Sequence, residues 1–296
     1  MALVLQECSR CKNTIPLDWS HCPHCGGYQN CPNVVMARQP AEQKALQERV
    51  DNARVAAIAR GARDQLDAFE RQLSVSQAVM GSTLAKLKPI VNQERDVFAT
   101  FHELAELRFY RETPSTSPNW NTVRPIAEIA LLGGPKQINQ LHYAALSLDA
   151  NSLPWYGECT VILKEEMIAH RASLFQENSA VYVDRNAPEL PVGSRSIWDE
   201  RGKLCTAKLA HRIMPSTKVD EFSELLLKQG PTGVDDEFVE VQIFGPMTFR
   251  TFERLKIAKA GAKPAARKRP RKRTGTPDER ATLEYCRLNS VECELI

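Results

Sequence analysis

The sequence predicts a multidomain chain with a small metal-bound module (residues 1–35), a helical segment (40–112) and an α+β domain (122–257). Three observations support this prediction. Paired cysteines gather in the first thirty residues, a proline-free stretch with helical periodicity follows, and strand and helix patterns alternate after a Pro- and Ser-rich linker at 113–121. A basic segment, 258–296, comes next, and its charge predicts that it is largely disordered.

The metal module contains two CxxC pairs separated by ten residues, in the stretch CSRCKNTIPLDWSHCPHCG. Each pair forms a tight turn that points two sulfurs at one place, and two facing pairs make a tetrahedral thiolate site. We therefore predict a structural zinc ion bound by Cys8, Cys11, Cys22 and Cys25. The stretch resembles the zinc-ribbon family. Such a closed site stabilises the fold and leaves no open position for chemistry, which favours a docking role.

Three further residues near the predicted ligands are expected to have no part in metal binding. His21 and His24 should face solvent, because four thiolates already complete the shell, and Cys31 should be a bystander. A redox role for the CxxC pairs would need a strand–helix–strand context that the surrounding sequence lacks.

Composition points to a chain that can bury a substantial core, with 43% hydrophobic and 25% charged residues. No stretch approaches the roughly 18 apolar residues that a membrane helix needs. The first residues, MALVLQECSR, show no signal-peptide pattern. We therefore expect reduced thiols and a cytoplasmic location, or a nuclear one in a eukaryotic host.

The helical segment is predicted from residues 41–88, which contain no proline and repeat apolar residues at three- to five-residue steps. Gly81 is expected to end or bend this helix, and a second helix is expected over 89–112. The two would form a helical hairpin or stalk, or would cover a neighbouring domain. Residues 41–112 could therefore also contact a protein partner.

The domain after the linker combines strand and helix patterns. Strands are expected at 158–163 (ECTVIL), 180–184 (AVYVD) and 238–244 (FVEVQIF), where β-branched and aromatic residues stand between turn signals. Helices are expected over 199–214 and 217–229. The sequence contains no GxGxxG, GxxxxGK[ST], HExxH or GxSxG motif, so the enzyme classes defined by those motifs are not indicated.

Three segments of this domain carry a family resemblance. They are LHYAALSLDANSLPWYGECTVIL (141–163), AHRASLFQENSAVY (169–182) and FVEVQIFGPMTFRTFERLKI (238–257). In this order they resemble the ADP-ribosyltransferase toxins of bacteria and phages, whose last catalytic strand carries a glutamate. The resemblance spans residues 141–257 and implies an ADP-ribosyltransferase-like mixed sheet, with NAD as a substrate.

The resemblance also implies roles for single residues. Glu240 would be the catalytic carboxylate that stabilises the oxocarbenium-like sugar formed when nicotinamide leaves. His142, Tyr143, Arg171 and Ser173 would hold the NAD.

Two features of the sequence count against a simple transfer of these roles. Phe238 stands where arginine-modifying members carry Glu or Gln, which weakens arginine as the acceptor. Asp236 and Glu237 directly precede the strand, so Glu240 could instead belong to an acidic strand edge that faces solvent.

Charge is unevenly distributed along the chain. Residues 254–273 contain ten Lys or Arg and no acid, and removing these ten charges from the net +3 leaves about −7 on the rest. The arm from Lys263 to Arg273 suits contact with phosphates and therefore nucleic acid, with a steep dependence on salt.

The sequence thus leads to two hypotheses. The first is an effector of toxin or phage-defence type that transfers ADP-ribose from NAD to a macromolecule, nucleic acid included, with the zinc ribbon for docking. The alternative is a non-catalytic adaptor that binds nucleic acid or protein through its ribbon, helices and basic arm.

Overall fold

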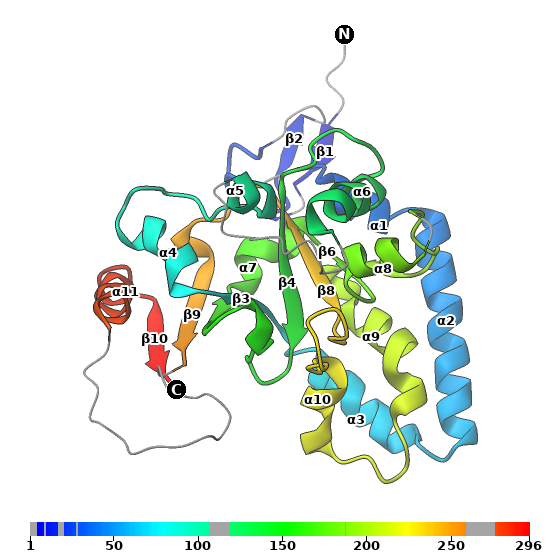
Figure 1. Cartoon of the computed structure of the whole chain (residues 1–296). Coiled ribbons are helices and arrows are strands. Elements are labelled where there is room, and N and C mark those ends of the chain that lie inside the picture. The colour runs from blue at the N-terminus through cyan, green and yellow to red at the C-terminus, as the bar shows by residue number, and fades with distance from the viewer. Residues whose placement is uncertain are drawn as a thin grey trace, which may run out of the picture.

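A mixed sheet of eight strands forms the centre of the computed structural model, with helices on both of its faces (Figure 1). The strand order is β10-β9-β5-β3-β4-β8-β6-β7, and every neighbouring pair is antiparallel except β10 and β9. The structure describes residues 5–8, 10–16, 21–27, 29–106, 119–186, 188–258 and 276–296.

The strands are short, as the turn-rich sequence between them requires. Their bounds are β3 Gln77–Ser82, β4 Leu141–Ser147, β5 Cys159–Leu163, β6 Ala172–Phe175, β7 Arg195–Ile197, β8 Glu240–Phe244, β9 Phe252–Ile257 and β10 Glu292–Leu295. A separate antiparallel pair, β1 Leu5–Glu7 and β2 Thr14–Pro16, belongs to the metal module.

The helices begin and end at residues suited to those positions. Pro40 starts α2 at a position where its missing N–H costs nothing, and Asn119 caps α6, which ends at Gly133 with φ 73°. In the described residues the helices are α1 Pro32–Ala37, α2 Pro40–Ala59, α3 Arg63–Leu73, α4 Leu84–Val91, α5 Phe101–Glu106, α6 Trp120–Leu132, α7 Glu165–Ile168, α8 Ser179–Arg185, α9 Arg201–Leu209, α10 Phe222–Leu226 and α11 Pro277–Leu288.

The two faces of the sheet differ in chemistry. Alternation along β8 sends Val241 and Ile243 into the main apolar core, which α2, α3 and α9 complete. Glu240 and Gln242 point to the opposite face, where α1, α6 and α8 pack. A buried polar network can therefore form on one side of the sheet while apolar packing stabilises the other.

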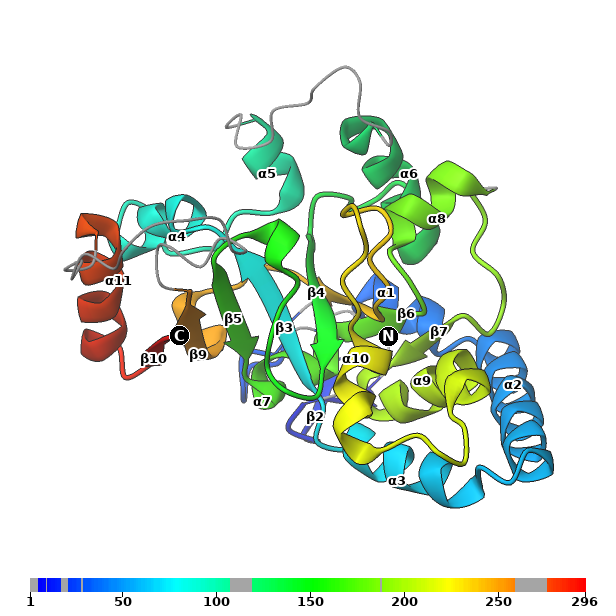
Figure 2. The same cartoon turned by 60° about the horizontal axis from the view of Figure 1, so that its bottom comes forward.

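The sheet divides between β3 and β4. These strands pair only at one end, through Gln77–Val79 and Ala145–Ser147, while the rest of β3 pairs with β5. Figure 2 shows the two strands spreading apart from this shared end, with α5 and α6 near the open end. The divergence leaves room for a cleft within the sheet layer.

The structure corrects the predicted helical segment. The helix expected over 41–88 is divided into α2 and α3. The strand β3 follows α3, and Gly81 lies inside that strand. The helix expected over 89–112 is replaced by α4 and α5, with 107–112 outside the described residues. There is no stalk in the described residues. Instead, α2 and α3 cover the sheet, which is the other arrangement expected for this segment.

The prediction for 180–184 is also wrong. These residues belong to α8, because the Asn178 side chain accepts from the backbone N–H groups of Ala180 and Val181 and starts a helix there. Strand β5, strand β8 and the helix expected over 199–214, seen as α9 with a short helical turn at each end, are confirmed. The helix expected over 217–229 is reduced to α10 after one short turn.

The prediction that 258–296 is largely disordered is wrong for residues 276–296. They form α11 and β10, and β10 pairs with β9 at the edge of the sheet. The arm Lys263–Arg273 and linker residues 113–118 lie outside the described residues.

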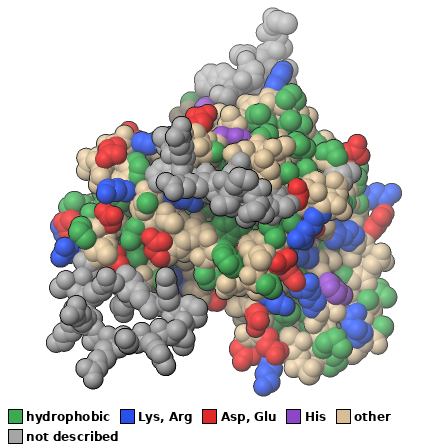
Figure 3. All heavy atoms as spheres, in the orientation of Figure 1, with side chains coloured by type: hydrophobic (Ala, Val, Ile, Leu, Met, Phe, Trp, Pro, Cys, Tyr) green, Lys and Arg blue, Asp and Glu red, His purple; other side chains and the backbone are tan. Residues whose placement is uncertain are grey.

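Acidic and basic side chains are both scattered over the face seen in Figure 3. Within the described residues, no helix has the length and apolar character needed to cross a membrane.

Candidate functional site

The four predicted zinc ligands come together in the structure. Their Sγ atoms all lie within 4.8 Å of one another, with 3.7 Å between Cys8 and Cys25 and 3.6 Å between Cys11 and Cys22. Sulfurs placed at about 2.3 Å around a tetrahedral zinc ion are about 3.8 Å apart, so the cluster fits this metal. The four thiols can therefore hold a zinc ion.

Hydrogen bonds around the cluster favour the thiolate form of Cys8 and Cys11. The backbone N–H of Asn13 and its side-chain amide lower the pKa of Cys11 to about 6. The Gln29 amide donates to Cys8 Sγ at 3.2 Å. His21 and His24 are exposed and stand outside the cluster, as expected. The donors from Asn13 and Gln29 orient the metal ligands and stabilise their charge.

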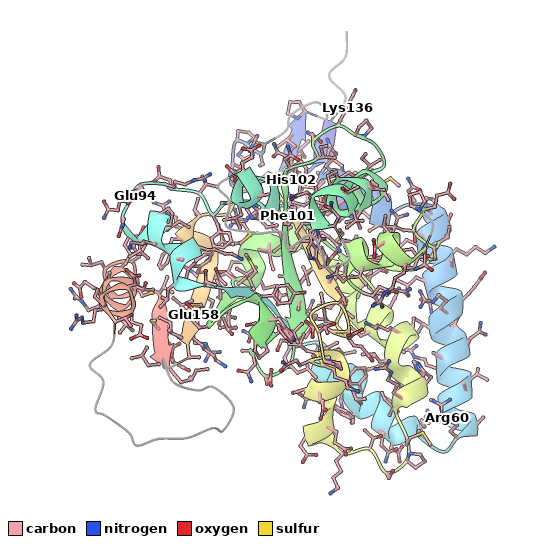
Figure 4. All side chains as sticks on the ribbon, in the orientation of Figure 1. Arg60, Glu94, Phe101, His102, Lys136 and Glu158 are labelled. Atoms are coloured by element: carbon pink, nitrogen blue, oxygen red, sulfur yellow. The ribbon has the colours of Figure 1, made fainter. Side chains whose placement is uncertain are left out.

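A cleft of about 130 Å³ occupies the space where β3 and β4 diverge. Met80 to Ser82 of β3 line one wall, and residues 142–145 of β4 line the other. Phe98, Phe101 and Leu104 cover it, the last two from α5. Figure 4 places Phe101 and His102 on this helix, above β4.

Glu240 lies at the cleft with only 2% of its surface exposed, on a strand with neighbours on both sides. The solvent-facing strand edge considered from the sequence is therefore wrong. Oε1 accepts from Ser179 Oγ at 2.5 Å and from Gln242 Nε2 at 2.9 Å, and Oε2 is 3.3 Å from Arg124 Nη1. These donors hold the carboxylate in one orientation.

A second buried carboxylate, Glu128 of α6, lies behind the cleft wall. It accepts from the Tyr143 hydroxyl at 2.8 Å and the Asn139 N–H at 2.9 Å, and it pairs with His102 Nε2 at 3.0 Å. Burial acts against ionisation, but these hydrogen bonds lower the pKa of Glu128 below its usual value. Arg124 stacks on the Tyr143 ring, 4.0 Å from its centre, and connects the two acidic groups.

His142 and Tyr143, to which the resemblance assigns NAD binding, line the same cleft as Glu240. Burial, together with the charge of Arg171, lowers the pKa of His142 to about 3, so its imidazole is neutral near pH 7. Burial raises the pKa of Tyr143, whose hydroxyl stays protonated and donates to Glu128.

Arg171 and Ser173 do not line the cleft. The Arg171 guanidinium donates to the carbonyls of Phe244, Gly245 and Pro246, and so secures the turn after β8. Ser173 donates to Gln242 Oε1 at 3.1 Å, which places it behind Glu240.

Several site residues were missed from the sequence. Gln242 could have been found, because strand alternation puts it on the same face as Glu240. Asn178 and Ser179 lie within the segment AHRASLFQENSAVY, where the residue pattern predicts a strand at 180–184 in place of the helix that Asn178 caps. Arg124 and Glu128 stand on α6, N-terminal to the three segments that carry the resemblance, and no local signal marks them.

Comparison with known proteins adds no family. No protein-family model matches the chain, and no curated protein matches it significantly.

Proposed function

We propose that this protein transfers ADP-ribose from NAD to a macromolecular target, with Glu240 as the catalytic carboxylate. The observation that carries the proposal is a buried, fully oriented carboxylate at a cleft, beside His142 and Tyr143. They are three of the five residues that the resemblance to ADP-ribosyltransferases assigns to catalysis and NAD binding; Arg171 and Ser173 are the other two.

The chemistry at the cleft wall suits this reaction. Glu240 lines the cleft together with Arg124 and Lys86, and the His142 imidazole is neutral, so the cleft as a whole has no excess of negative charge. The favourable interaction with a positively charged nicotinamide ring is therefore local to the Glu240 carboxylate. When its bond to ribose breaks, nicotinamide leaves as a neutral molecule and the positive charge passes to the sugar. The preorganised Glu240 carboxylate then stabilises that charge, and an acceptor nucleophile attacks the same carbon.

The size of the cleft also limits what enters it. Its volume of about 130 Å³ is below the roughly 300–1,000 Å³ of typical sites for drug-sized ligands. A single ring fits, whereas the remainder of a dinucleotide would extend past α5. We infer that α5, which contributes Phe101 and Leu104, shifts when NAD binds.

The test is incubation of the purified protein with labelled NAD and either cell protein or nucleic acid. Label should appear in one acceptor class, and Glu240→Gln should lower its incorporation by about 100-fold or more, since an electrostatic stabiliser of the transition state is lost. Glu253→Gln, an exposed glutamate on β9, is the matched control and should retain full activity.

Thermal unfolding of both variants would show that each is folded. Labelling that persists in folded Glu240→Gln contradicts the proposed role. No NAD turnover and no label, with salt-sensitive nucleic-acid binding intact, would instead favour the non-catalytic adaptor.

A further inference from the structure

A side-chain path begins at the metal module. Gln29, 6% exposed, uses its amide Nε2 to donate both to Cys8 Sγ at 3.2 Å and to the Gly27 carbonyl at 2.9 Å. The chain then enters α1, whose second residue is Asn33. The cysteine cluster and α1 are therefore connected by a short, hydrogen-bonded segment.

Asn33 points from α1 into the sheet and is 1% exposed. Its Nδ2 donates to Ser173 Oγ at 3.1 Å, and also contacts the carbonyls of Gln242 at 3.0 Å and Arg171 at 3.2 Å. One amide group thereby holds β6 and β8 together at the positions next to Glu240.

The path continues to the carboxylate with one consistent donor direction. Because Asn33 donates to the Ser173 hydroxyl, that hydroxyl donates onward to Gln242 Oε1 at 3.1 Å. Gln242 then donates through Nε2 to Glu240 Oε1 at 2.9 Å. Hydrogen bonds in such a chain polarise one another, and this one ends on a negative charge that strengthens each step.

Packing alone does not account for an asparagine at this position. Apolar residues, among them Val34 of the same helix and Phe244, are buried on this side next to the polar residues that Asn33 contacts. An amide buried there costs free energy, the more so because Asn33 Oδ1 has no hydrogen-bond partner among the residues that the structure describes. The hydrogen bonds that Asn33 donates through Nδ2 to β8, Ser173 and Arg171 therefore explain an asparagine at this position.

We infer that Asn33 is a positioning residue through which the zinc module holds Glu240 in its reactive orientation. This inference rests on the proposed function for its catalytic consequence. The metal module is then part of the active-site framework in addition to being a docking unit. Loss of zinc, or of the Gln29 contact, loosens α1, lets Gln242 rotate and removes a donor from Glu240.

The test compares wild type with Asn33→Ala and the matched control Val34→Ala, which loses packing on α1 but keeps the hydrogen-bonded path. Each protein is prepared with zinc and after chelation. Amide hydrogen exchange is measured by mass spectrometry over β6 and β8. Gln29→Ala, kept loaded with zinc, provides the same disturbance without removal of the metal.

Chelation of the wild type should raise exchange in both strands by about tenfold, the effect of one lost hydrogen bond. In Asn33→Ala exchange should already be raised, and chelation should add less than twofold. Val34→Ala should respond to chelation like the wild type, and zinc-loaded Gln29→Ala should resemble Asn33→Ala. Wild-type exchange unaffected by chelation and by Gln29→Ala, or a full zinc response in Asn33→Ala, overturns the inference.

Kinetics give a separate readout. Asn33→Ala should lower kcat for NAD turnover by about tenfold with KM within twofold, because the residue does not touch substrate. A raised KM at unchanged kcat would contradict a positioning role. If no variant turns over NAD, the proposed function fails, while hydrogen exchange still decides whether the zinc module holds β8.

Discussion

At the scale of the residue, Glu240 shows how a buried charge is tolerated. Three side chains donate hydrogen bonds to its carboxylate. A hydrogen bond to a charged group contributes about 1.5–3 kcal/mol to stability, and removal of all three donors would leave the buried charge without a partner. The same donors prevent rotation of the carboxylate. Stability and preorganisation are therefore obtained from one set of contacts.

His142 leads to a prediction on acid stability. Its folded-state pKa of about 3 lies below the unfolded value of about 6.5, so between these values the unfolded chain binds the proton. Its contribution to stability is complete above pH 6.5 and is lost as the pH falls toward 3. The expected slope is about 1.4 kcal/mol per pH unit. Denaturant unfolding at pH 7, 6 and 5 should show His142→Gln with a slope lower by about half of this amount between pH 7 and 6, where the unfolded histidine is only partly protonated, and by close to the full amount between pH 6 and 5.

The exposed His211 provides the control for this experiment. His211→Gln should keep the wild-type slope, and acid release of zinc affects all three proteins alike. A slope that His142→Gln leaves unchanged would contradict the neutral, buried state of His142. His170, whose pKa burial lowers to about 4, should add to the wild-type slope in the same direction.

At the scale of the element, α11 and β10 act as a cover for one edge of the sheet. Cys286 and Val291 are buried against the main core, and β10 supplies β9 with a parallel neighbour. An uncovered β9 would present unpaired backbone groups and apolar surface. This module therefore stabilises a sheet edge at some distance from the cleft.

A pair of substitutions tests this role. Val291→Ser, at a position 6% exposed, should lower the free energy of unfolding by about 2 kcal/mol, because a buried aliphatic side chain is lost. Leu288→Ser, at 64% exposure in the same module, should change it by less than about 0.5 kcal/mol. Equal effects of the two substitutions in chemical denaturation would show that the module does not pack on the core.

At the scale of the whole molecule, the divided sheet and the metal module meet on the same polar face. The cleft exists because β3 pairs with β4 at one end only and with β5 along the rest of its length. Helix α1, which follows the metal module in the chain, contacts the strands beside Glu240 through Asn33. Three segments far apart in sequence thus build one site.

Elemental analysis tests the metal assignment for the molecule. We expect one zinc per chain, falling to near zero in Cys8→Ser or Cys25→Ser because a three-thiolate shell binds far more weakly. Cys31→Ser is the matched control, since Cys31 is buried in a different cluster, and it should keep its zinc. A folded wild-type protein without zinc would refute the assignment.

The sequence by itself determined those features that depend on neighbouring residues. The zinc ligands lie within eighteen positions of one another, so their spacing alone defined the site. Strands β5 and β8 were found because alternation and turn signals are local. The position of Gln242 on the same face as Glu240 also follows from strand alternation and could have been predicted from the sequence.

Only the tertiary structure decided which distant segments pair. Residues 77–82 carry no strong strand pattern, and they became β3 because β4 and β5 offer hydrogen-bond partners on both sides. Arg124, Glu128 and Asn33 joined the site through helix packing, which a linear pattern does not encode. Long-range pairing sets the cleft, and the cleft determines which polar residues act together.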